Sequence, residues 1–386
     1  MSHVILTDHA ERDHLLPLTH TRPVADIRIG LWTIAERWKR RWDVSVSYLT
    51  QEYLTPVYGA PRSGESLYVN GALFPTDEVV EQIMSLKEGE TLTFEGKWIA
   101  TRSSERPAEF SANGTEARGD ISVVERPWKI FQWNGWAIDQ DMEWLFKNAM
   151  SQAVPSHVTL IGERIFVDEG AEILPSIINA DEGWIYVGKD AVIMEGSMVR
   201  GSLALMDHST LKMGAKIYGP TTIGPHSKVG GEVNNSVIFG YSNKAHDGFL
   251  GNSVIGEWCN LGADTNTSNL KNNYAEVKVF NYALGRREGT TSQFCGLTMG
   301  DHAKAGINTM FNTGTVCGAF ANVFGGDFPH QVIPDFAWGG AAGFKQYRLN
   351  DAIDVARKVM IRRNIELSEE MEGVYNHIHD HYPVQK

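Results

Sequence analysis

Residues 187–229 read VGKDAVIMEGSMVRGSLALMDHSTLKMGAKIYGPTTIGPHSKV, and an aliphatic residue returns at every sixth position. These residues are Val187, Ile193, Val199, Leu205, Leu211, Ile217, Ile223 and Val229. A period of six belongs neither to an α-helix nor to a strand of an open sheet. It is typical of a chain wound into a coil with three flat sides, each side one hexapeptide long. The stretch therefore predicts a prism of stacked coils, hydrogen-bonded in parallel at about 4.8 Å, with aliphatic ladders inside.

The same spacing continues on both sides of this stretch. It includes Ile161, Val167 and Ile173 upstream, and Val237, Phe249, Ile255, Leu261, Met299, Ala305, Phe311, Cys317 and Val323 downstream. The phase breaks from 173 to 187, 229 to 237 and 261 to 299 are multiples of six plus two, which indicates a lengthened corner within one prism. Residues 264–292 leave the pattern, and we expect one long loop there, outside a prism that runs from about 158 to 330.

The flanking sequence predicts two further parts. Residues 1–150 alternate between strand-like and helix-like stretches, including a helix over 27–42, a helix capped by Thr76 and a helix over 139–148, and this predicts an α/β domain. Residues 349–378 are charged, with apolar residues at helical spacing, and predict one C-terminal helix. The expected domains are residues 1–150, 151–345 and 346–386.

Composition limits the classes of partner. The formal net charge of −12 argues against a nucleic-acid partner, which would require a basic face. No apolar run reaches membrane-spanning length, and the first residues lack the pattern of a signal peptide. The three cysteines form no CxxC motif, so the sequence predicts a protein of the reducing cytoplasm that does not act on a membrane.

Residues 243–263 read NKAHDGFLGNSVIGEWCNLGA, and Thr267-Ser268-Asn269 follows. This segment resembles the acetyltransferase core of the bifunctional glucosamine-1-phosphate N-acetyltransferase/N-acetylglucosamine-1-phosphate uridylyltransferase family, which reads SKAGH, YLGD, IG, NIGAG and TCN over the same span. The order of a nucleotidyltransferase-like domain followed by a prism also agrees. The resemblance runs from 15–19 through 308–314 and is closest to a divergent branch with a shortened first domain.

The resemblance implies a Rossmann-like nucleotidyltransferase-like α/β domain, followed by a left-handed parallel β-helix of hexapeptide repeats that ends in an α-helix. It also implies a homotrimer with active sites between subunits. His246 matches the catalytic base of the family, and an imidazole near its ordinary pKa is suited to accept a proton from a sugar ammonium. A solvent-facing corner histidine is the alternative interpretation.

Other matched positions concern the two substrates of acetyl transfer. Asn260 and Asn269 match asparagines that contact the amino sugar, although turn formation is a competing explanation in this asparagine-rich stretch. Phe249 replaces a family tyrosine, Lys216 replaces a phosphate-binding arginine and Asn234 replaces a phosphate-binding lysine. Phosphate recognition could instead use Lys244, Lys271 or Lys278. For acetyl-coenzyme A, the candidate contacts are Ala305, Gly306, Asn308 and Gly318.

The first domain departs from the family pattern. The strand over 4–6 is followed by Thr7-Asp8-His9-Ala10-Glu11-Arg12, without the glycines of the family loop. Arg12 and Arg22 are candidates for binding the nucleotide, with a solvated surface cluster as the alternative. Asn70 stands where the family has a metal-binding aspartate, and Asn134 resembles the second, asparagine ligand, so both are candidates to contact the nucleotide and Mg²⁺.

These expectations define a transferase of nucleotide-sugar synthesis of the UDP-N-acetylglucosamine type, acting in cell-envelope biosynthesis. The prism would acetylate an amino-sugar 1-phosphate, and the first domain would bind a nucleoside triphosphate or nucleotide sugar. Two alternatives remain open. The β-helix could be a trimerisation scaffold for a sugar-1-phosphate nucleotidyltransferase, or the chain could be a non-catalytic trimer that binds sugar nucleotides.

Overall fold

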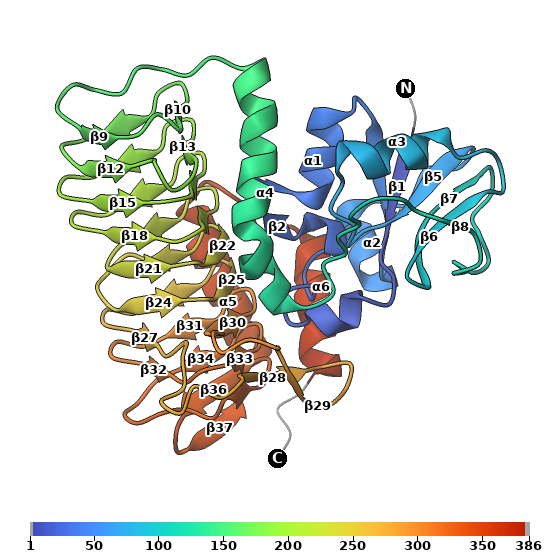
Figure 1. The fold of residues 1–386 in the computed structure, drawn as a ribbon. Helices are drawn as coiled ribbons and strands as arrows, with labels where there is room; N and C mark the ends of the chain where they lie inside the picture. The colour runs from blue at the N-terminus through green and yellow to red at the C-terminus, as the bar shows by residue number, and fades with distance from the viewer. Residues whose placement is uncertain (1–2, 383–386) are drawn as a thin grey trace.

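The computed structural model describes residues 3–382 as a first domain, a long helix, a column of stacked coils and two C-terminal helices (Figure 1). Helix α4 (Pro127–Asn148) stands between the first domain and the column and packs on β19, β22 and β25 of the column. Within residues 3–382, none of the helices combines the length and the apolar character that a bilayer crossing needs.

The first domain is built on one six-stranded sheet of order β4-β1-β5-β7-β6-β8. Strands β4, β1 and β5 are parallel, whereas β7 pairs antiparallel with both β5 and β6. The strands are β1 (His3–Thr7), β4 (Ser45–Leu49), β5 (Ser66–Asn70), β6 (Thr91–Phe94), β7 (Lys97–Ser103) and β8 (Thr115–Glu116). The helices are α1 (Ile34–Arg41), α2 (Thr55–Tyr58) and α3 (Asp77–Ser85), with short 3-10 helices at Arg12–Leu15, Val24–Asp26 and Glu52–Leu54. The predicted α/β domain is confirmed, including the cap of α3 by Thr76.

The helix predicted over 27–42 is wrong in its first half. A hairpin of β2 (Arg28–Ile29) and β3 (Trp32–Thr33) turns at Gly30, whose φ is +71°. A Cβ at Gly30 would lie 2.5 Å from Asp141 Oδ2, so the turn requires glycine. Helix α1 begins only after Thr33, which forms a capping box with Glu36. The helix predicted over 139–148 is the last part of α4, which begins at Pro127.

The column has three faces of parallel strands, as the sixfold repeat predicts, and only the last strand of the second face, β37, is antiparallel to its neighbour among the described strands of the three faces. The first face holds β10 (Ile165–Val167), β13 (Ile185–Val187), β16 (Leu203–Leu205), β19 (Thr221–Ile223), β22 (Val237–Gly240), β25 (Val254–Glu257), β30 (Leu297–Met299), β33 (Thr315–Cys317) and β35 (Val332–Ile333). The second face holds β11 (Glu172–Ile173), β14 (Val192–Ile193), β17 (Thr210–Leu211), β20 (Lys228–Val229), β23 (Asn243–Lys244), β26 (Asn260–Leu261), β31 (Lys304–Ala305), β34 (Asn322–Val323), β36 (Ala337–Gly340) and β37 (Gly343–Gln346). The third face holds β9 (Thr159–Ile161), β12 (Ile177–Asn179), β15 (Met198–Arg200), β18 (Lys216–Tyr218), β21 (Glu232–Asn234) and β24 (Phe249–Gly251), followed by the pair β27 (Asn266–Thr267) and β32 (Met310–Phe311).

The aliphatic ladder from Val187 to Val229 lies in the core of the column, so this prediction is confirmed. Three positions of the extended ladder are wrong by one residue. Leu160 is in register with the buried Ile178, while Ile161 is 42% exposed. Ile238 pairs with Ile223 inside the column, while Val237 points outward into the core shared with the first domain. Leu250 pairs with Val233 inside, while Phe249 lies on the outer surface of the third face. Each lengthened corner shifts the inward-facing position by one residue, so a prediction based on a fixed spacing of six names the wrong residue there.

The segment over 264–292 is not the single loop that its lost periodicity predicts. After β27, strands β28 (Lys278–Asn281) and β29 (Arg286–Gly289) form an antiparallel hairpin that projects from the column. Asn281 hydrogen-bonds to His14, and Arg126 pairs with Glu288 at 2.7 Å, so the hairpin joins the column to the first domain. The predicted single C-terminal helix is two helices, α5 (Leu349–Ile361) and α6 (Glu369–His381).

A stack of aromatic rings follows the corner between the first and second faces, which we call the aromatic corner. One ring per coil stacks on the next, in the order His208, His226, Tyr241, Trp258, His302, Phe320 and Phe336. Each of these residues has φ between +51° and +60°, so the left-handed corner aims every side chain in the same direction. Helix α6 covers the lower half of the stack through Tyr375, which contacts His302 and Phe320.

Candidate functional site

His246 lies at the corner where the chain turns from β23 on the second face to β24 on the third, which we call the histidine corner. Its imidazole is exposed and borders a hollow of about 340 Å³. Asn260 lines the same hollow from β26, one coil further along the column, together with Asn243 and Ile307. The structure therefore brings together the predicted base and one of the two predicted sugar-contacting asparagines.

Small residues create this hollow. Successive coils place Gly230, Ala245, Gly262 and Gly306 at the histidine corner. A Cβ at Gly262 would lie 2.6 Å from the carbonyl carbon of Gly306, so the stacked backbones leave no room for a side chain there. A bare corner beside an imidazole and an amide allows an extended substrate to approach backbone and side-chain groups together.

Lys244 takes a ladder position between Val229 and Leu261 and is almost fully buried. Its ammonium donates a hydrogen bond of 2.6 Å to the carbonyl oxygen of His246. Burial lowers the pKa of Lys244 to about 8, against the opposing influence of Asp247 and Asp264. The buried ammonium of Lys244 is engaged by the backbone of the histidine corner and lies away from the surface on which a phosphate would bind.

The remaining predicted sugar contacts lie on the third face, around the corner from the hollow. Lys216 and Phe249 are each in register with Glu232 on the outer surface of that face. Asn269 donates to Asn252 Oδ1 at 2.7 Å beside the Phe249 ring, which lies over Gly251. Asn234 donates to the carbonyl oxygen of Tyr218 at 3.3 Å. These residues flank the histidine corner without lining its hollow.

The candidate coenzyme contacts divide between two corners. Gly306 and Asn308 lie at the histidine corner next to Ile307, and Asn308 N donates to Ala263 O at 2.8 Å. Ala305 is in the ladder beneath them and faces the interior. Gly318 lies at the aromatic corner, where a Cβ would come within 2.4 Å of Asp335 N. The structure does not bring Gly318 to the hollow.

Both predicted nucleotide-binding arginines are buried and engaged within the protein. Arg12 donates to Tyr53 Oη at 2.5 Å and to the carbonyl oxygen of Thr19 at 3.1 Å. Arg22 pairs with Asp301 of the column and lies 3.4 Å from Glu257. Thr21 adds a hydrogen bond of 2.5 Å to Asp301. In this arrangement Arg22 joins the two domains, and a solvated surface cluster is excluded for both arginines.

The residues present do not fit the expected Mg²⁺ site. Asn70, at the end of β5, donates to Glu11 and accepts from the backbone of Ala72. Asn134, on α4, accepts from Gly30 N at 2.8 Å and from Thr222 Oγ1 at 3.0 Å, which occupies both lone pairs of its oxygen. The two amides share no partner, and within residues 3–382 no three His, Cys, Asp or Glu side chains gather as ligands of a metal would.

The first domain nevertheless has a hollow of about 370 Å³ beside the ends of β1 and β5. Trp98 and Phe110 form an aromatic wall, with ring centroids 4.3 Å apart. Lys97 and Arg126 line the same hollow together with Glu11 and Glu125. Lys97 pairs with Glu125, and Arg126 pairs with Glu288 of the hairpin. Ligands of parallel sheets bind outside the carboxyl ends of strands where the strand order reverses, as it does between β1 and β5. Trp98, Phe110, Lys97 and Arg126 were not predicted from the sequence, where an aromatic pair bordered by basic residues was the available signal.

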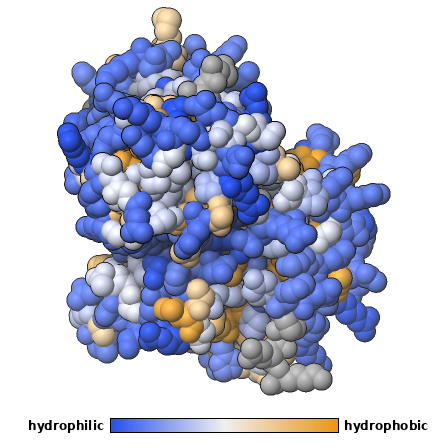
Figure 2. Space-filling view, turned by 90° about the vertical axis from the view of Figure 1, so that its right-hand side faces the viewer, coloured by the Kyte–Doolittle hydropathy of each residue, from blue (hydrophilic) through white to orange (hydrophobic). Residues whose placement is uncertain are grey.

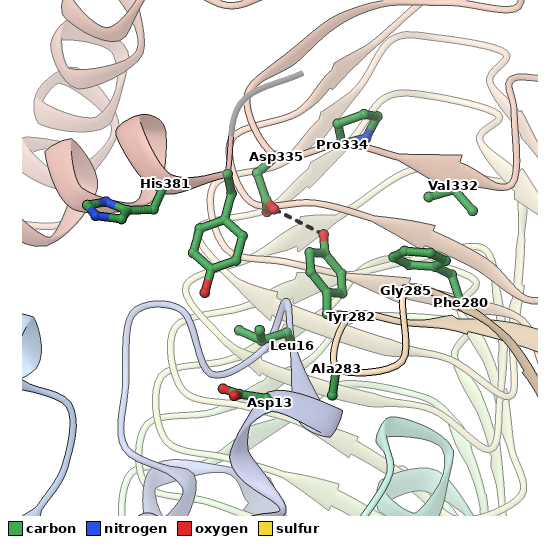
Figure 3. A pocket seen from close by; sticks show the side chains of 11 residues that line it. Asp13, Leu16, Phe280, Tyr282, Ala283, Gly285, Val332, Pro334, Asp335 and His381 are labelled. Atoms are coloured by element: carbon green, nitrogen blue, oxygen red, sulfur yellow. Dashed lines mark hydrogen bonds between the residues drawn. The ribbon is translucent and has the colours of Figure 1, made fainter. Parts of the chain in front are cut away.

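A cavity of about 590 Å³ lies between the first domain, the β28–β29 hairpin, the last coil and the end of α6 (Figure 3). Tyr282 donates to Asp335 Oδ2 at 3.1 Å on one wall, and Asp13 lies on the opposite side. The described lining holds these two carboxylates without a lysine or arginine, so it is unsuited to a phosphorylated ligand. Figure 2, which faces the first domain, shows a mostly hydrophilic surface with small, scattered apolar patches.

Residues 4–149 match the family model described as sugar nucleotidyl transferase. The chain is 30% identical over 213 residues to a bifunctional sugar-1-phosphate nucleotidylyltransferase/acetyltransferase of Sulfurisphaera tokodaii, covering 55% of this chain and 46% of that protein. It is 26% identical over 260 residues to the bifunctional protein GlmU of Methanocaldococcus jannaschii, covering 67% of this chain and 56% of that protein.

The chain thus spans about half of the length of the curated relatives that it matches. Among solved structures, LpxA, a UDP-N-acetylglucosamine acyltransferase from Bacteroides fragilis 9343, aligns with a TM-score of 0.25 at 13% identity, over 61% of this chain and 100% of that one. The chain therefore matches the sugar nucleotidyl transferase model over residues 4–149 and is similar, over about half to two thirds of its length, to proteins named bifunctional sugar-1-phosphate nucleotidylyltransferase/acetyltransferase and bifunctional protein GlmU.

Proposed function

We propose that the column transfers an acetyl group from acetyl-coenzyme A to the amine of an amino-sugar 1-phosphate. The observation that carries this proposal is that His246 and Asn260 line one hollow at a corner made of small residues. Relatives named as nucleotidylyltransferase/acetyltransferases support the same class of reaction.

In this reaction the amine nitrogen attacks the thioester carbonyl, the carbon–sulfur bond breaks and the coenzyme leaves as its thiol. His246 accepts the proton that the amine loses, and Lys244 holds the backbone of that histidine. Asn260 holds sugar hydroxyls in the hollow, since an amide both donates and accepts hydrogen bonds without bringing charge. Gly306 and Asn308 supply backbone contacts to the extended coenzyme at the same corner. The rate gain comes mainly from aligning amine and thioester.

A second function concerns the first domain, which would bind a nucleotide in the hollow beside Trp98 and Phe110. An aromatic wall suits a base, and Lys97 and Arg126 would have to exchange their carboxylate partners, Glu125 and Glu288, for the phosphates. Turnover with Mg²⁺ has weaker support, because Arg12, Arg22, Asn70 and Asn134 are already engaged within the protein. Loss of nucleotide affinity in Trp98→Ala, measured by calorimetry with a uridine nucleotide, tests this function.

The proposed assembly is a cytoplasmic homotrimer. The outer surface of the third face exposes Ile177 and Met198, each by 46%, and Met213 is 66% exposed at the adjoining corner. Exposed apolar side chains along one face favour burial against another subunit. Such an interface would bring the third face of one protomer next to the histidine corner of its neighbour.

His246→Ala tests the acetyltransferase function. We expect thiol release from acetyl-coenzyme A to fall by about 100-fold or more, as for loss of a general base, with the oligomeric state unchanged in light scattering. The matched control is His208→Ala, because His208 is also a corner histidine with an exposed side chain on the column. Unchanged thiol release in His246→Ala would remove His246 from the reaction and favour the scaffold interpretation of the column.

A further inference from the structure

Four cationic side chains gather beside the hollow of the histidine corner. Lys228 lies on the outer surface of β20, in register with Asn243, which lines the hollow. Arg363, just beyond the end of α5, reaches to 3.5 Å from Asn243 Oδ1. Arg362 precedes it, and both arginines act electrostatically on Lys228. Residues more than 100 positions apart in the sequence therefore converge next to His246.

Lys212 extends this group along the histidine corner. It lies two coils from Ala245, with Gly230 in the coil between them. A Cβ at Gly230 would lie 2.6 Å from Ala245 O and 3.1 Å from Lys212 Cβ, so these three residues are stacked closely. Because Gly230 has no side chain, the corner stays bare between the Lys212 side chain and the hollow that His246 borders.

The positive charge of this group is not neutralised within the protein. In the part of the chain that the structure describes, no carboxylate lies within ion-pair distance of any of the four side chains, although the molecule carries a formal net charge of −12. Burial, and then the charges of Arg363, Lys212 and Arg362, lower the pKa of Lys228. A bound phosphate dianion would attract all four cationic side chains and so offset the repulsion between them.

We propose that Lys212, Lys228, Arg362 and Arg363 form a phosphate-binding subsite that holds a substrate phosphate while the reacting groups meet at His246. The proposal rests on the acetyltransferase function and adds residues that neither the motif nor the resemblance indicates. It places phosphate recognition on the second face, whereas Lys216 and Asn234 lie on the third. Both the acceptor sugar phosphate and the phosphates of the coenzyme have the required chemistry.

The test uses the double variant Lys228→Gln/Arg363→Gln in the full chain, which removes two charges and keeps side-chain length. Thiol release is measured against the concentration of glucosamine 1-phosphate and, separately, of acetyl-coenzyme A. We expect KM to rise by about tenfold or more for the substrate whose phosphate is bound, with kcat within about twofold. If the subsite holds the sugar phosphate, the difference between variant and wild type should vanish with glucosamine as acceptor. If it holds the 3′-phosphate of the coenzyme, the difference should vanish with acetyl-dephospho-coenzyme A as donor. A raised KM for acetyl-coenzyme A that persists with the dephospho donor assigns the subsite to the diphosphate of the coenzyme.

The matched control is Lys189→Gln/Arg348→Gln, which removes the same charges from exposed positions away from the hollow. Two results would overturn the subsite and leave the proposed function standing, provided that the wild type turns over. In the first, both KM values are unchanged in the test variant. In the second, they rise equally in the control.

A binding measurement separates failure of the subsite from failure of the function. If the wild type shows no thiol release, calorimetry with inorganic pyrophosphate still tests the cluster. Binding that is at least tenfold weaker in the test variant than in the control would support the subsite while the proposed function falls. Equal affinity, or no binding to the wild type, would overturn the subsite.

Discussion

Lys244 places an ammonium group where the neighbouring coils carry Val229 and Leu261. Other coils have an aliphatic residue at this position. Burying the ammonium of Lys244 there lowers the stability of the column, and the hydrogen bond to the carbonyl of His246 offsets part of this cost. The folded pKa of about 8 lies below the ordinary value of 10.5. The unfolded chain therefore binds more protons between these pH values, and this residue makes stability rise with pH through that window.

Lys244→Met should accordingly stabilise the protein at pH 7, by up to about 3 kcal/mol, while lowering kcat for thiol release. The stability difference from the wild type should shrink between pH 8 and pH 10. Denaturant unfolding at both pH values measures it, with Lys189→Met as an exposed control. A variant that is less stable than the wild type at every pH would mean that the hydrogen bond to His246 outweighs the burial of the charge.

At the scale of single residues, the sequence predicted the site only where a local motif carried it. His246 and Asn260 lie 14 positions apart in one motif, and the structure brings them into one hollow. Arg363 and Lys228 belong to different elements, and the spacing of residues does not indicate that α5 ends beside β20. The engagement of Arg22 by Asp301 is likewise a long-range contact that no local pattern predicts.

At the scale of elements, the aromatic corner fastens α6 to the column. Tyr375 hydrogen-bonds to His302 at 2.8 Å, and both side chains are buried. Burial, followed by the charges of Lys304 and Arg22, holds the pKa of His302 well below its ordinary value, so the ring stays neutral in the stack. The attachment of α6 to the aromatic stack therefore depends on one hydrogen bond between two neutral side chains, Tyr375 and His302.

Tyr375→Phe should lower the free energy of unfolding by about 1–2 kcal/mol, because His302 loses its hydrogen-bond partner in a buried position. It should also speed amide hydrogen exchange in α6 relative to the coils. Tyr347→Phe is the control, since Tyr347 packs in the same cluster and its hydroxyl has no hydrogen-bond partner among the described residues. Equal exchange of α6 in both variants would argue against fastening by this bond.

The elements that the sequence predicted well are those with a strict repeat. The ladder from Val187 to Val229 follows because each coil is identical in length. The β28–β29 hairpin was read as loop because its strands are four residues long and polar at Arg286 and Arg287. The hairpin at Gly30 was read as helix because Ile27, Leu31 and Ile34 imitate helical spacing. In the structure Ile27 and Ile34 pack into the core of the first domain, while Leu31 packs with Trp32, Ile138 and Met142.

At the scale of the whole molecule, the two domains share one hydrophobic core. Val237 and Val254 of the first face join Leu73, Phe131 and other residues of the first domain and α4 in a single cluster. The pairing of Arg22 with Asp301 lies beside this cluster and is almost completely buried. A continuous core predicts that the domains unfold together.

Asp301→Asn should lower the free energy of unfolding by about 3 kcal/mol, because Glu257 at 3.4 Å is then the one carboxylate that Arg22 keeps among the described residues. Scanning calorimetry should give one transition for both proteins, shifted to lower temperature in the variant. Asp354→Asn, which breaks an exposed pair with Lys358, should change stability by less than about 0.5 kcal/mol. Two separate transitions in the wild type would contradict a shared core.

The shared core also has a consequence for biosynthesis. The strands of the first domain leave the ribosome early, but their apolar surface is completed by residues as late as Cys295 and Val316. The emerging domain must therefore wait, partly uncovered, until most of the column has been translated. Its nascent form is a natural client for a chaperone, and a message truncated within the column would release an amino-terminal fragment prone to aggregate.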